Sequence, residues 1–389
     1  MRVLLVTGAY FPEFSSGGLQ SQAVSRLLKD RVEFVVLTTA TDITLPSHAL
    51  VDGIRVSRVG IDVNSRWSAA TAAWRMLREL MGLMPRVDLV HVQGFSSKNI
   101  LISFVAKLFR RPVILHLQTS KHDEPAAIAA QGRLAWWAFT SADLYLSVSR
   151  SLMTPYLESG LPAAKIRLAP NGVDPVRFTP PRAGERRQLR AQLGLPVDRP
   201  LTLFVGVMSR DKQPAVLFQA WLRLQADPAT ASTLVFVGAT NPALFELGER
   251  VAEGLRGEAD RSGFGDRVLF VPPTAQIQDY FRAADVFAMP SAREGLPIVL
   301  LEAMACGVPA VASRLPGSTD TIIASEENGL LVPTGDVQAL AEALAFVLTN
   351  PDEAARLGAA GRQTVEERYS FSRVADQWMT AYRDVLGAL

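Results

Sequence analysis

The chain has 389 residues, of which 48% are hydrophobic and 20% charged, and this composition excludes an extended disordered chain and suits two large folded domains. A single cysteine, Cys306, excludes an internal disulfide. The sequence shows neither a signal-peptide pattern nor a run of roughly 18 apolar residues, so we expect a cytoplasmic protein. The net charge of +2 is uneven, because residues 1–180 hold 20 Lys and Arg against 13 Asp and Glu, and the remainder holds 20 against 25. The basic half can approach anionic lipid headgroups at the inner face of a membrane or a phosphorylated substrate, although chance imbalance explains the charges equally well.

Short apolar or β-branched runs alternate with helical patterns along the first half of the chain, which is typical of a parallel sheet covered on both faces. The expected strands are residues 2–7, 33–38, 88–92, 113–117, 144–148 and 166–168. Gly17 and Gly18 follow the first strand and are expected to precede a helix. There, backbone amides and the helix N-terminus can approach a phosphate, but a plain tight turn also explains the pair.

A second α/β series follows a segment without strand character. Residues 179–199 are rich in proline and arginine and are expected to form a linker. The second set of expected strands is residues 201–205, 233–237, 268–271, 286–289 and 308–312. Residues 371–389 carry apolar side chains at a spacing near four and are expected to form an amphipathic helix packed on a domain surface; these side chains are Val374, Trp378, Tyr382 and Leu386.

Two loops of the second series carry charged residues at the ends of expected strands. After the strand 201–205, Arg210 and Lys212 follow Gly206 and can place cations beside a diphosphate, although basic loop residues are commonly just solvated. Residues 297–307 are expected to form a helix that begins at a proline and ends at a glycine. Glu294 lies in the loop before it, and Glu302 lies within it, where an unpaired carboxylate needs a partner.

The stretch from Glu294-Gly295-Leu296-Pro297 to Glu302 and Gly307-Val308-Pro309 resembles the Glu-x7-Glu signature of retaining glycosyltransferases of family four. Residues 170–174 and the Gly17–Gly18 pair also resemble that family, and the similarity spans nearly the whole chain. The resemblance implies an α/β GT-B fold, in which two Rossmann-like doubly wound domains face a central cleft. The implied organisation is residues 1–178 for the acceptor, 179–199 as linker, 200–370 for the nucleotide sugar, and 371–389 as a helix packed back on the first domain.

The resemblance also implies roles for individual residues. Glu302 would bind the ribose of the donor and Glu294 the transferred sugar, while Lys212, with Gly17 and Gly18, would bind the diphosphate. His116, at the end of an expected strand, would lie near the reacting sugar, whereas His91 is left as structural. The helix start would supply backbone contacts to sugar and diphosphate from Leu296, Pro297, Ile298 and Val299.

This sequence departs from the family pattern at three places. Val207 stands where members usually have an arginine after the glycine, so Arg210 would have to supply the second cation. Pro272 and Pro273 replace a common glycine, so the loop that binds the base is expected to differ. Residues 316–320 stand where a glycine pair and a later glutamate are common, and their role stays open.

The implied reaction is transfer of a hexose-type sugar from a UDP- or GDP-linked donor to a hydroxyl of a glycan or lipid-linked acceptor, with retention at C1 and without a cofactor. No Asp-x-Asp cluster points to a metal, and no motif points to nucleic acid. Polysaccharide or glycolipid assembly is the setting by analogy. Two alternatives stay open, a nucleotide-sugar epimerase of the same fold and a catalytically silent sugar-binding protein, the latter suggested by Val207.

Two helical stretches of the first half combine basic and large apolar residues. Such stretches suit a peripheral contact with an anionic membrane, but a core stripe with solvated charges explains them as well. The residues are Trp67, Trp74, Arg75, Met76, Arg78 and Met81 in one stretch, and Lys107, Phe109, Arg110 and Arg111 in the other.

Overall fold

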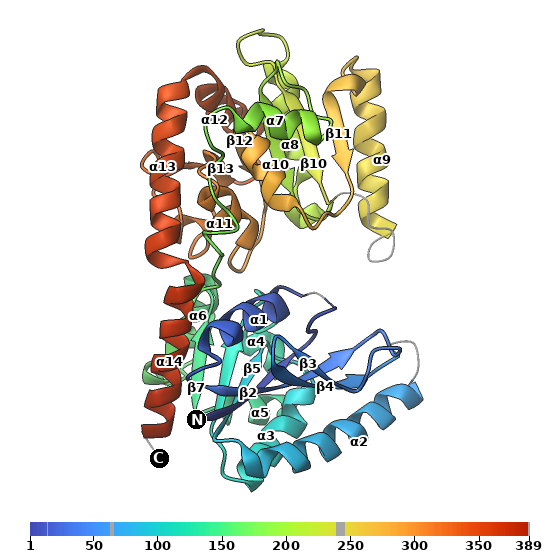
Figure 1. The fold of residues 1–389 in the computed structure, drawn as a ribbon, viewed down its shortest axis with the longest axis vertical. Coiled ribbons are helices and arrows are strands. Elements are labelled where there is room, and N and C mark those ends of the chain that lie inside the picture. The colour runs from blue at the N-terminus through green and yellow to red at the C-terminus, as the bar shows by residue number, and fades with distance from the viewer. Residues whose placement is uncertain (14, 63–65, 239–245, 388–389) are drawn as a thin grey trace. The chain divides into compact units, whose positions relative to one another are not determined.

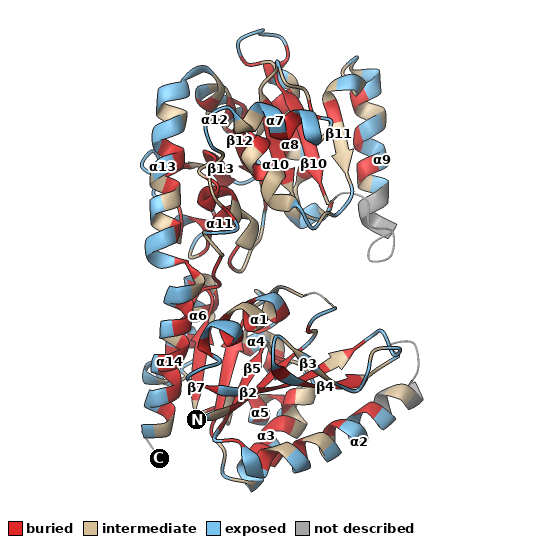
Figure 2. Cartoon of the chain, in the orientation of Figure 1, coloured by how far each residue is buried: buried red, intermediate tan, exposed pale blue. Residues whose placement is uncertain are grey.

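A computed structural model describes residues 1–13, 15–62, 66–238 and 246–387. The chain divides into two units (Figure 1): the first joins Met1–Gly172 to Phe371–Leu389, and the second is Val173–Ser370. Both contain a sheet whose buried strands are flanked by half-exposed helices (Figure 2). The described part of the chain includes no helix that is both long and apolar enough to cross a membrane.

The first unit holds an eight-stranded sheet in the order β3-β4-β2-β1-β5-β6-β7-β8, in which all neighbours but β3 and β4 are parallel. Val3, Leu4, Leu5 and Val6 of β1 are all buried, because helices cover both faces of the sheet. The strands are β1 (Arg2–Thr7), β2 (Glu33–Ala40), β3 (His48–Val51), β4 (Ile54–Gly60), β5 (Leu89–Gln93), β6 (Val113–Leu117), β7 (Leu144–Ser147) and β8 (Ile166–Leu168). The helices are α1 (Ser16–Leu28), α2 (Arg66–Leu83), α3 (Lys98–Leu108), α4 (Pro125–Ala129), α5 (Arg133–Thr140), α6 (Arg150–Glu158) and α14 (Phe371–Gly387), with 3₁₀ turns at Met84–Arg86 and Ala163–Lys165.

The hairpin β3–β4 is absent from the strands expected from the sequence. Its turn lies at Asp52 and Gly53, which both have positive φ (53° and 81°), as a two-residue hairpin requires. Strand β4 contains Arg55 and Arg58, so it lacks a continuous apolar run. Arg58 is nevertheless buried, because its guanidinium donates to the backbone carbonyls of Phe11 (2.7 Å) and Pro46 (3.3 Å).

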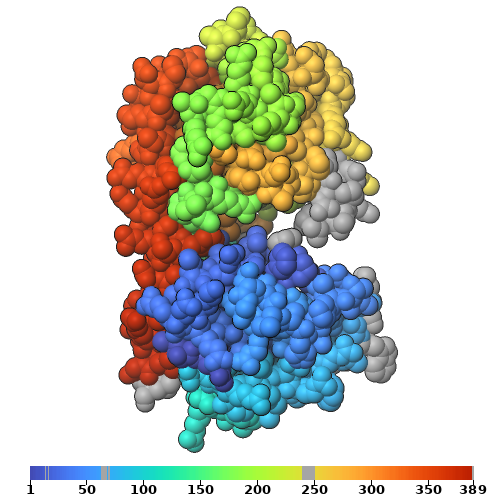
Figure 3. Space-filling model, in the orientation of Figure 1, coloured from blue at the N-terminus to red at the C-terminus, as the bar shows by residue number. Residues whose placement is uncertain are grey.

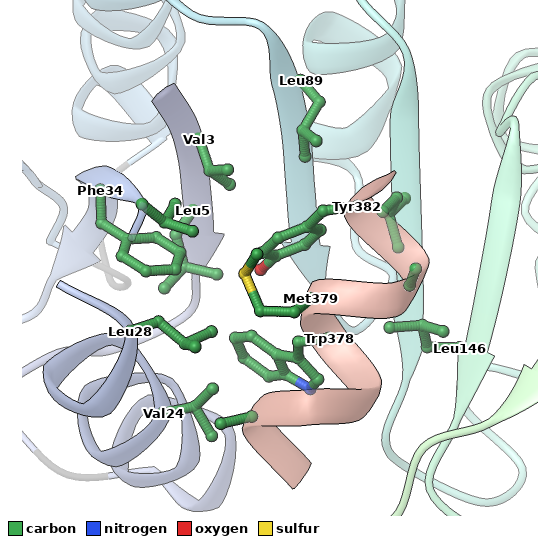
Figure 4. Packing of buried hydrophobic residues seen from close by; sticks show 14 of the residues in the cluster. Val3, Leu5, Val24, Leu28, Phe34, Leu89, Leu146, Trp378, Met379 and Tyr382 are labelled. Atoms are coloured by element: carbon green, nitrogen blue, oxygen red, sulfur yellow. The ribbon is translucent and has the colours of Figure 1, made fainter. Parts of the chain in front are cut away.

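Helix α14 belongs to the core of the first unit, although it is the last helix of the chain (Figure 4). Trp378, Met379 and Tyr382 point from one face of α14 toward the sheet and helix α1, where they meet Leu5 and Val24. The spacing of near four expected for residues 371–389 therefore reflects this buried stripe.

Beneath α14 lie two buried histidines with parallel rings, His91 and His116, whose centroids are 5.5 Å apart. His91 Nδ1 is 2.8 Å from the Tyr382 hydroxyl, and the Trp378 ring meets both imidazoles edge-on. Burial lowers the pKa of His116 to about 4 and that of His91 well below 6.5. Both imidazoles are therefore neutral at pH 7 and serve as core residues.

Lowering the pH from 7.5 to 5 is expected to destabilise the first unit, by about 2 kcal/mol for His116 alone. In the unfolded chain its imidazole titrates near 6.5. Between that pH and about 4, the unfolded state binds the extra proton, so stability falls as pH falls. Urea unfolding followed by circular dichroism at both pH values measures the difference.

A histidine variant controls this experiment, because His116→Gln should shrink the difference. His122 works in the opposite sense, because its hydrogen bond to Asp123 raises its pKa and adds stability at low pH. A His116→Gln protein with the full pH dependence would contradict the assignment.

The second unit holds a six-stranded parallel sheet in the order β11-β10-β9-β12-β13-β14. The strand β14 was not expected, since it is only three residues long. The strands are β9 (Leu201–Val205), β10 (Thr233–Val237), β11 (Val268–Val271), β12 (Val286–Met289), β13 (Ala310–Ser313) and β14 (Leu330–Val332). The helices are α7 (Glu185–Gln192), α8 (Pro214–Leu224), α9 (Glu246–Arg261), α10 (Ile277–Ala283), α11 (Ile298–Ala305), α12 (Val337–Thr349) and α13 (Pro351–Arg368), with 3₁₀ turns at Arg210–Lys212, Gly265–Arg267 and Thr319–Thr321.

The segment 179–199 is not a linker, because it is built into the second unit. It contains helix α7, in which Arg190 is buried and donates to Asp285 Oδ2 (2.5 Å) and to the Ala283 carbonyl (2.8 Å). Arg186 reaches the other oxygen of Asp285 at 3.1 Å, and the backbone amide of Leu201 donates to Oδ2 at 2.7 Å. The chain passes between the units at 172–173 and 370–371 instead.

Each sheet has one point at which the chain order of its strands reverses. In the first unit the reversal lies between β1 and β5, and in the second it lies between β9 and β12. Ligands of open α/β sheets bind at the carboxyl ends of the strands that flank such a point.

Candidate active site

In the second unit, the loops after β9 and β12 meet through charged side chains. Lys212 Nζ donates to Glu294 Oε1 at 2.5 Å, and the side chains are only 28% and 10% exposed. The sequence predicted both residues, and the structure brings them together across 82 positions at the reversal point of the sheet. A lysine ammonium has three donors, so Lys212 can hold Glu294 and still bind an anion.

A second ion pair fixes the same two loops. Arg293 Nη2 lies 2.5 Å from Asp211 Oδ2, and the Ala292 amide donates to the Asp211 carbonyl at 2.7 Å. Each of the two loops thus contributes one cation and one anion, and each charge pairs with its opposite on the other loop. Sequence reasoning missed Asp211 and Arg293, and only their position beside Lys212 and Glu294 could have indicated them.

The backbone after Lys212 has an unusual conformation. Gln213 has φ and ψ of 48°, in the left-handed region, which costs a non-glycine residue about 1 kcal/mol or more. Its Oε1 is buried without a hydrogen-bond partner. Such conformations concentrate at functional sites, in agreement with the position of this loop at the reversal point.

Helix α11 starts with unpaired backbone donors. Its N-cap is Pro297, which offers no capping side chain, and the helix begins one residue later than expected. Among the described residues, the amides of Leu296, Ile298 and Val299 have no acceptor. These N–H groups and the helix dipole make this end suitable for an anion.

Glu302 lies one turn along α11 from Ile298 and is half-buried. Burial raises its pKa to about 7, and Arg177 opposes the rise. Its carboxylate makes no hydrogen bond or ion pair with any described residue, so it is available to accept from ligand hydroxyls. Arg177, which sequence reasoning missed, also donates to the Ala275 carbonyl at 2.9 Å, in the loop after the Pro272–Pro273 pair.

Arg210 and Val207 are exposed in the loop after β9. Arg210 forms no ion pair within the described chain, so its guanidinium is free to act as the second cation. The side chain of Val207 is 41% exposed and adds no charge.

In the first unit, the glycine pair lies inside helix α1 and not before it, because the helix begins at Ser16. The Gly18 amide donates to the Ser15 hydroxyl at 3.0 Å. A Cβ at Gly18 would lie 2.3 Å from the Ala9 carbonyl oxygen, whereas one at Gly17 would meet only Gln93 at 3.7 Å. Close backbone packing therefore accounts for Gly18, whereas a side chain at Gly17 would make only an ordinary contact with Gln93.

His116 does not lie in an accessible site of the first unit. Its side chain is 1% exposed, and its Nε2 is 2.9 Å from the Ala169 carbonyl. Its Nδ1 is buried without a partner. Leu117 and not His116 ends β6, and the His116 imidazole lies in the core under α14. Its contact with the reacting sugar stays a prediction.

Sequence reasoning missed Lys98, which lies at the reversal point of the first sheet. Its Nζ donates to the Thr7 carbonyl at the end of β1 (3.1 Å), and no carboxylate among the described residues pairs with it. Burial lowers its pKa to about 8. Nearby, Gln118 Nε2 donates to Gln93 Oε1 at 2.7 Å, and Gln118 Oε1 is buried without a partner.

Comparison with known families assigns the chain. Residues 185–364 match the model described as "Glycosyl transferases group 1", and residues 20–172 match "Glycosyl transferase 4-like domain". The two matches cover most of both units. The chain belongs to the group 1 glycosyl transferases. The match to the "Glycosyl transferases group 1" model includes all four residues of the two ion pairs between the loops after β9 and β12.

This glycosyl transferase resembles several curated proteins. It is 38% identical over 223 residues to D-inositol 3-phosphate glycosyltransferase of Xylanimonas cellulosilytica, covering 56% of the chain and 51% of the relative. It is 33% identical over 258 residues to alpha-maltose-1-phosphate synthase of Mycolicibacterium smegmatis, covering 64% and 65%. The chain thus spans about half the length of the curated relatives it matches first.

The fold of the glycosyl transferase is GT-B, with two Rossmann-like units. The structure of Anabaena HepE in complex with UDP and glucose matches it with a TM-score of 0.79 at 20% identity, covering 99% of this chain and 100% of that one. Within the described residues, no group of three or more His, Cys, Asp and Glu side chains is placed to hold a metal.

Proposed function

We propose that the chain is a retaining hexosyltransferase that uses a UDP- or GDP-linked sugar and glycosylates a hydroxyl of a glycan or lipid-linked acceptor, in polysaccharide or glycolipid assembly. The observation that carries the proposal is the Lys212–Glu294 contact at the reversal point of the second sheet, near the uncapped end of α11. The names of its relatives support a sugar donor and hydroxyl-bearing acceptors, and HepE was solved with UDP and glucose.

In the proposed reaction, the bond between sugar C1 and the diphosphate oxygen breaks as the acceptor hydroxyl bonds to C1 on the same face. The acceptor proton passes to the departing phosphate oxygen, so charge and atoms balance. Positive charge develops on the sugar and negative charge on the diphosphate. Lys212, Arg210 and the amides of Ile298 and Val299 stabilise that diphosphate, and no metal is required for this role.

Glu294 and Glu302 bind different parts of the donor. Glu294, held by Lys212, accepts hydroxyls of the transferred sugar and orients it. Glu302 accepts the ribose hydroxyls, since its carboxylate has no protein partner and an isolated acceptor in an apolar helix needs one. Retaining glycosidases need two carboxylates about 5 Å apart around C1. The engagement of Glu294 with Lys212 favours an orienting role over that of a nucleophile.

Nucleotide release tests the function. Purified protein is incubated with a panel of UDP- and GDP-sugars, with and without glycan or lipid-linked acceptors, in EDTA. Release that depends on acceptor, with the product keeping the donor's anomeric configuration by NMR, is the expected result. Conversion of the sugar without acceptor would indicate the epimerase, and binding without release would indicate the silent protein. A requirement for added divalent metal would contradict the metal-free mechanism.

For the acceptor, we place its binding at the reversal point of the first sheet, where Lys98 offers an ammonium without a carboxylate partner. Lys98→Met is expected to raise the acceptor KM roughly tenfold or more, because a charge-assisted hydrogen bond is lost. Lys29→Met, at the exposed carboxyl end of α1, is the matched control and should leave the KM unchanged. An unchanged acceptor KM in Lys98→Met would place the acceptor elsewhere.

Contact with an anionic membrane at its inner, cytoplasmic face completes the proposal. Phe104 and Leu108 lie one turn apart on α3 and are 59% and 60% exposed, close in sequence to Lys107 and Arg110. On α2, Met76 is buried while Trp74 and Met81 are exposed; the side chain of Trp67 lies outside the described residues. Loss of co-sedimentation with anionic vesicles in a Phe104→Ser, Leu108→Ser double variant is the expected result, and unaltered co-sedimentation would reject α3 as the contact.

A further inference from the structure

A cavity of about 420 Å³ lies at the edge of the first unit where the parallel strands begin. Its walls come from the first residues of β1, from β2, β3 and β4, and from the last turns of α2 with the 3₁₀ turn that follows. The face of the first unit in Figure 3 is formed largely by this amino-terminal, blue part of the chain. The volume is within the range of small-ligand sites, about 300 to 1,000 Å³.

The cavity combines arginines with an apolar floor. Val35 and Val56 are buried at its base, and four guanidinium groups line it against one carboxylate, Glu79; the arginines are Arg2, Arg55, Arg78 and Arg86. An excess of guanidinium groups around a hollow favours an anionic ligand, because the planar fork of arginine matches phosphate and carboxylate oxygens.

Two of the arginines are held in place from outside the cavity. Glu33 lies 2.7 Å from Arg2 and 2.5 Å from Arg55, and these contacts lower the pKa of its carboxyl. Arg2 Nη1 also donates to the Arg86 carbonyl at 3.0 Å, and its backbone amide donates to Asp88 at 2.8 Å. Glu33 thus fixes two guanidinium groups side by side, and Glu33 and Asp88 do not line the cavity.

The other two arginines keep their donors free. The guanidinium of Arg86 has no partner among the described residues. That of Arg78 comes only within 3.9 Å of Glu79 and lies over the Trp74 ring at 5.4 Å. An anion that enters the cavity would be stabilised by hydrogen bonds from these unpaired guanidinium donors.

We propose that this cavity binds a ligand carrying a phosphate group, with Arg78 and Arg86 contacting the phosphate and the valine floor contacting its apolar part. The site lies at the amino ends of the strands, whereas Thr7, Lys98 and Gly17 lie at the carboxyl ends. It therefore differs from the site proposed for the acceptor and does not depend on the proposed reaction.

Two sources supply this chemistry, a free phosphorylated molecule and an anionic lipid headgroup. Trp74 and Met81 lie on the same stripe of α2 as Arg78 and are 62% and 42% exposed. Leu50, next to the cavity residue Ala49, is also exposed. Such apolar side chains at the mouth suit a headgroup at a membrane surface, while the cavity alone suits the free molecule.

The test uses the full chain with two probes. Inorganic phosphate, titrated by calorimetry, represents the free ligand, and vesicles of phosphatidylcholine with or without phosphatidylglycerol represent the headgroup. Binding to either probe is expected, with a loss of roughly tenfold or more in the Arg78→Gln, Arg86→Gln double variant. Phosphate binding identifies a free ligand as sufficient, and binding only to anionic vesicles identifies the lipid headgroup.

A second double variant separates a built site from general charge attraction. Arg31→Gln with Arg133→Gln removes the same charge from exposed positions of the first unit that do not line the cavity. Its affinity is expected to stay near that of the unmodified chain. Equal losses in both double variants, binding to neither probe, or binding insensitive to Arg78 and Arg86 would overturn the proposal. Circular dichroism confirms that each variant is folded.

Discussion

Replacing Lys212 by methionine is expected to lower kcat for sugar transfer by roughly a hundredfold or more, the usual effect of removing one group that stabilises charge in the transition state. The Lys212 side chain is half-buried in the loop after β9, and its ammonium group bonds directly to Glu294. Its loss removes the cation proposed for the departing diphosphate and frees the carboxylate proposed to orient the sugar. Initial rates with saturating donor and acceptor measure the effect.

Three further variants separate catalysis from folding in this experiment. The Glu294 side chain is only 10% exposed, so in Lys212→Met its carboxylate loses its partner without gaining water. This loss costs about 1 to 3 kcal/mol of stability. Adding Glu294→Gln should restore the stability and leave the activity lost. Arg210→Gln, an exposed cation in the same turn, should cost less than Lys212→Met, and Glu294→Ala alone should abolish most transfer. Normal transfer by Lys212→Met or Glu294→Ala would reject the site.

Replacing Asp285 by alanine is expected to destabilise the second unit by about 3 kcal/mol or more, as is usual when one partner of a buried ion pair is removed. Its carboxylate accepts from Arg186, Arg190 and the Leu201 amide, and the Arg190 side chain is only 7% exposed. Without Asp285, a buried guanidinium and the first amide of β9 lose their acceptor. Urea unfolding followed by circular dichroism measures the change.

Asp198→Ala provides the matched control, because Asp198 is an exposed carboxylate of the same segment and forms no ion pair with described residues. Its unfolding midpoint should stay within the experimental error of the unmodified protein. A double variant, Asp285→Ala with Arg190→Met, should recover part of the stability, because it removes the stranded charge as well. Equal midpoints for Asp285→Ala and the unmodified protein would show that segment 179–199 is not anchored by this pair.

The parallel strands could be located from the sequence because they are buried on both faces and so appear as continuous apolar runs. Strands β1, β6, β8, β9, β10, β11 and β12 match their expected ranges. The hairpin β3–β4 escaped notice because its charged residues are satisfied by contacts that only the folded chain supplies, as with Arg58 and the Phe11 carbonyl. Helix α7 likewise depends on Asp285, almost a hundred positions away.

The candidate site likewise contains residues that could be predicted from the sequence and residues that could not. The strand-end loop predicted Lys212, since such loops carry ligand groups. The family resemblance implied the roles of Glu294 and Glu302. The ion pair of Asp211 with Arg293 joins distant loops, and no local pattern encodes it. The burial of His116 was not predicted, because one residue decides whether a strand-end side chain faces the open edge or the core. Lys98 was missed because its isolation from carboxylates exists only in three dimensions.

Helix α14 sets the order in which the two units can be completed during synthesis. The core of the first unit includes Trp378 and Tyr382, which leave the ribosome only after residues 173–370 have been made. The second unit is one uninterrupted stretch and can fold as soon as it emerges, whereas the first must wait with an apolar face uncovered. The second unit can therefore complete its fold before the first. Until α14 emerges, chaperones have a defined surface to protect, which is the apolar face of the first unit that α14 later covers.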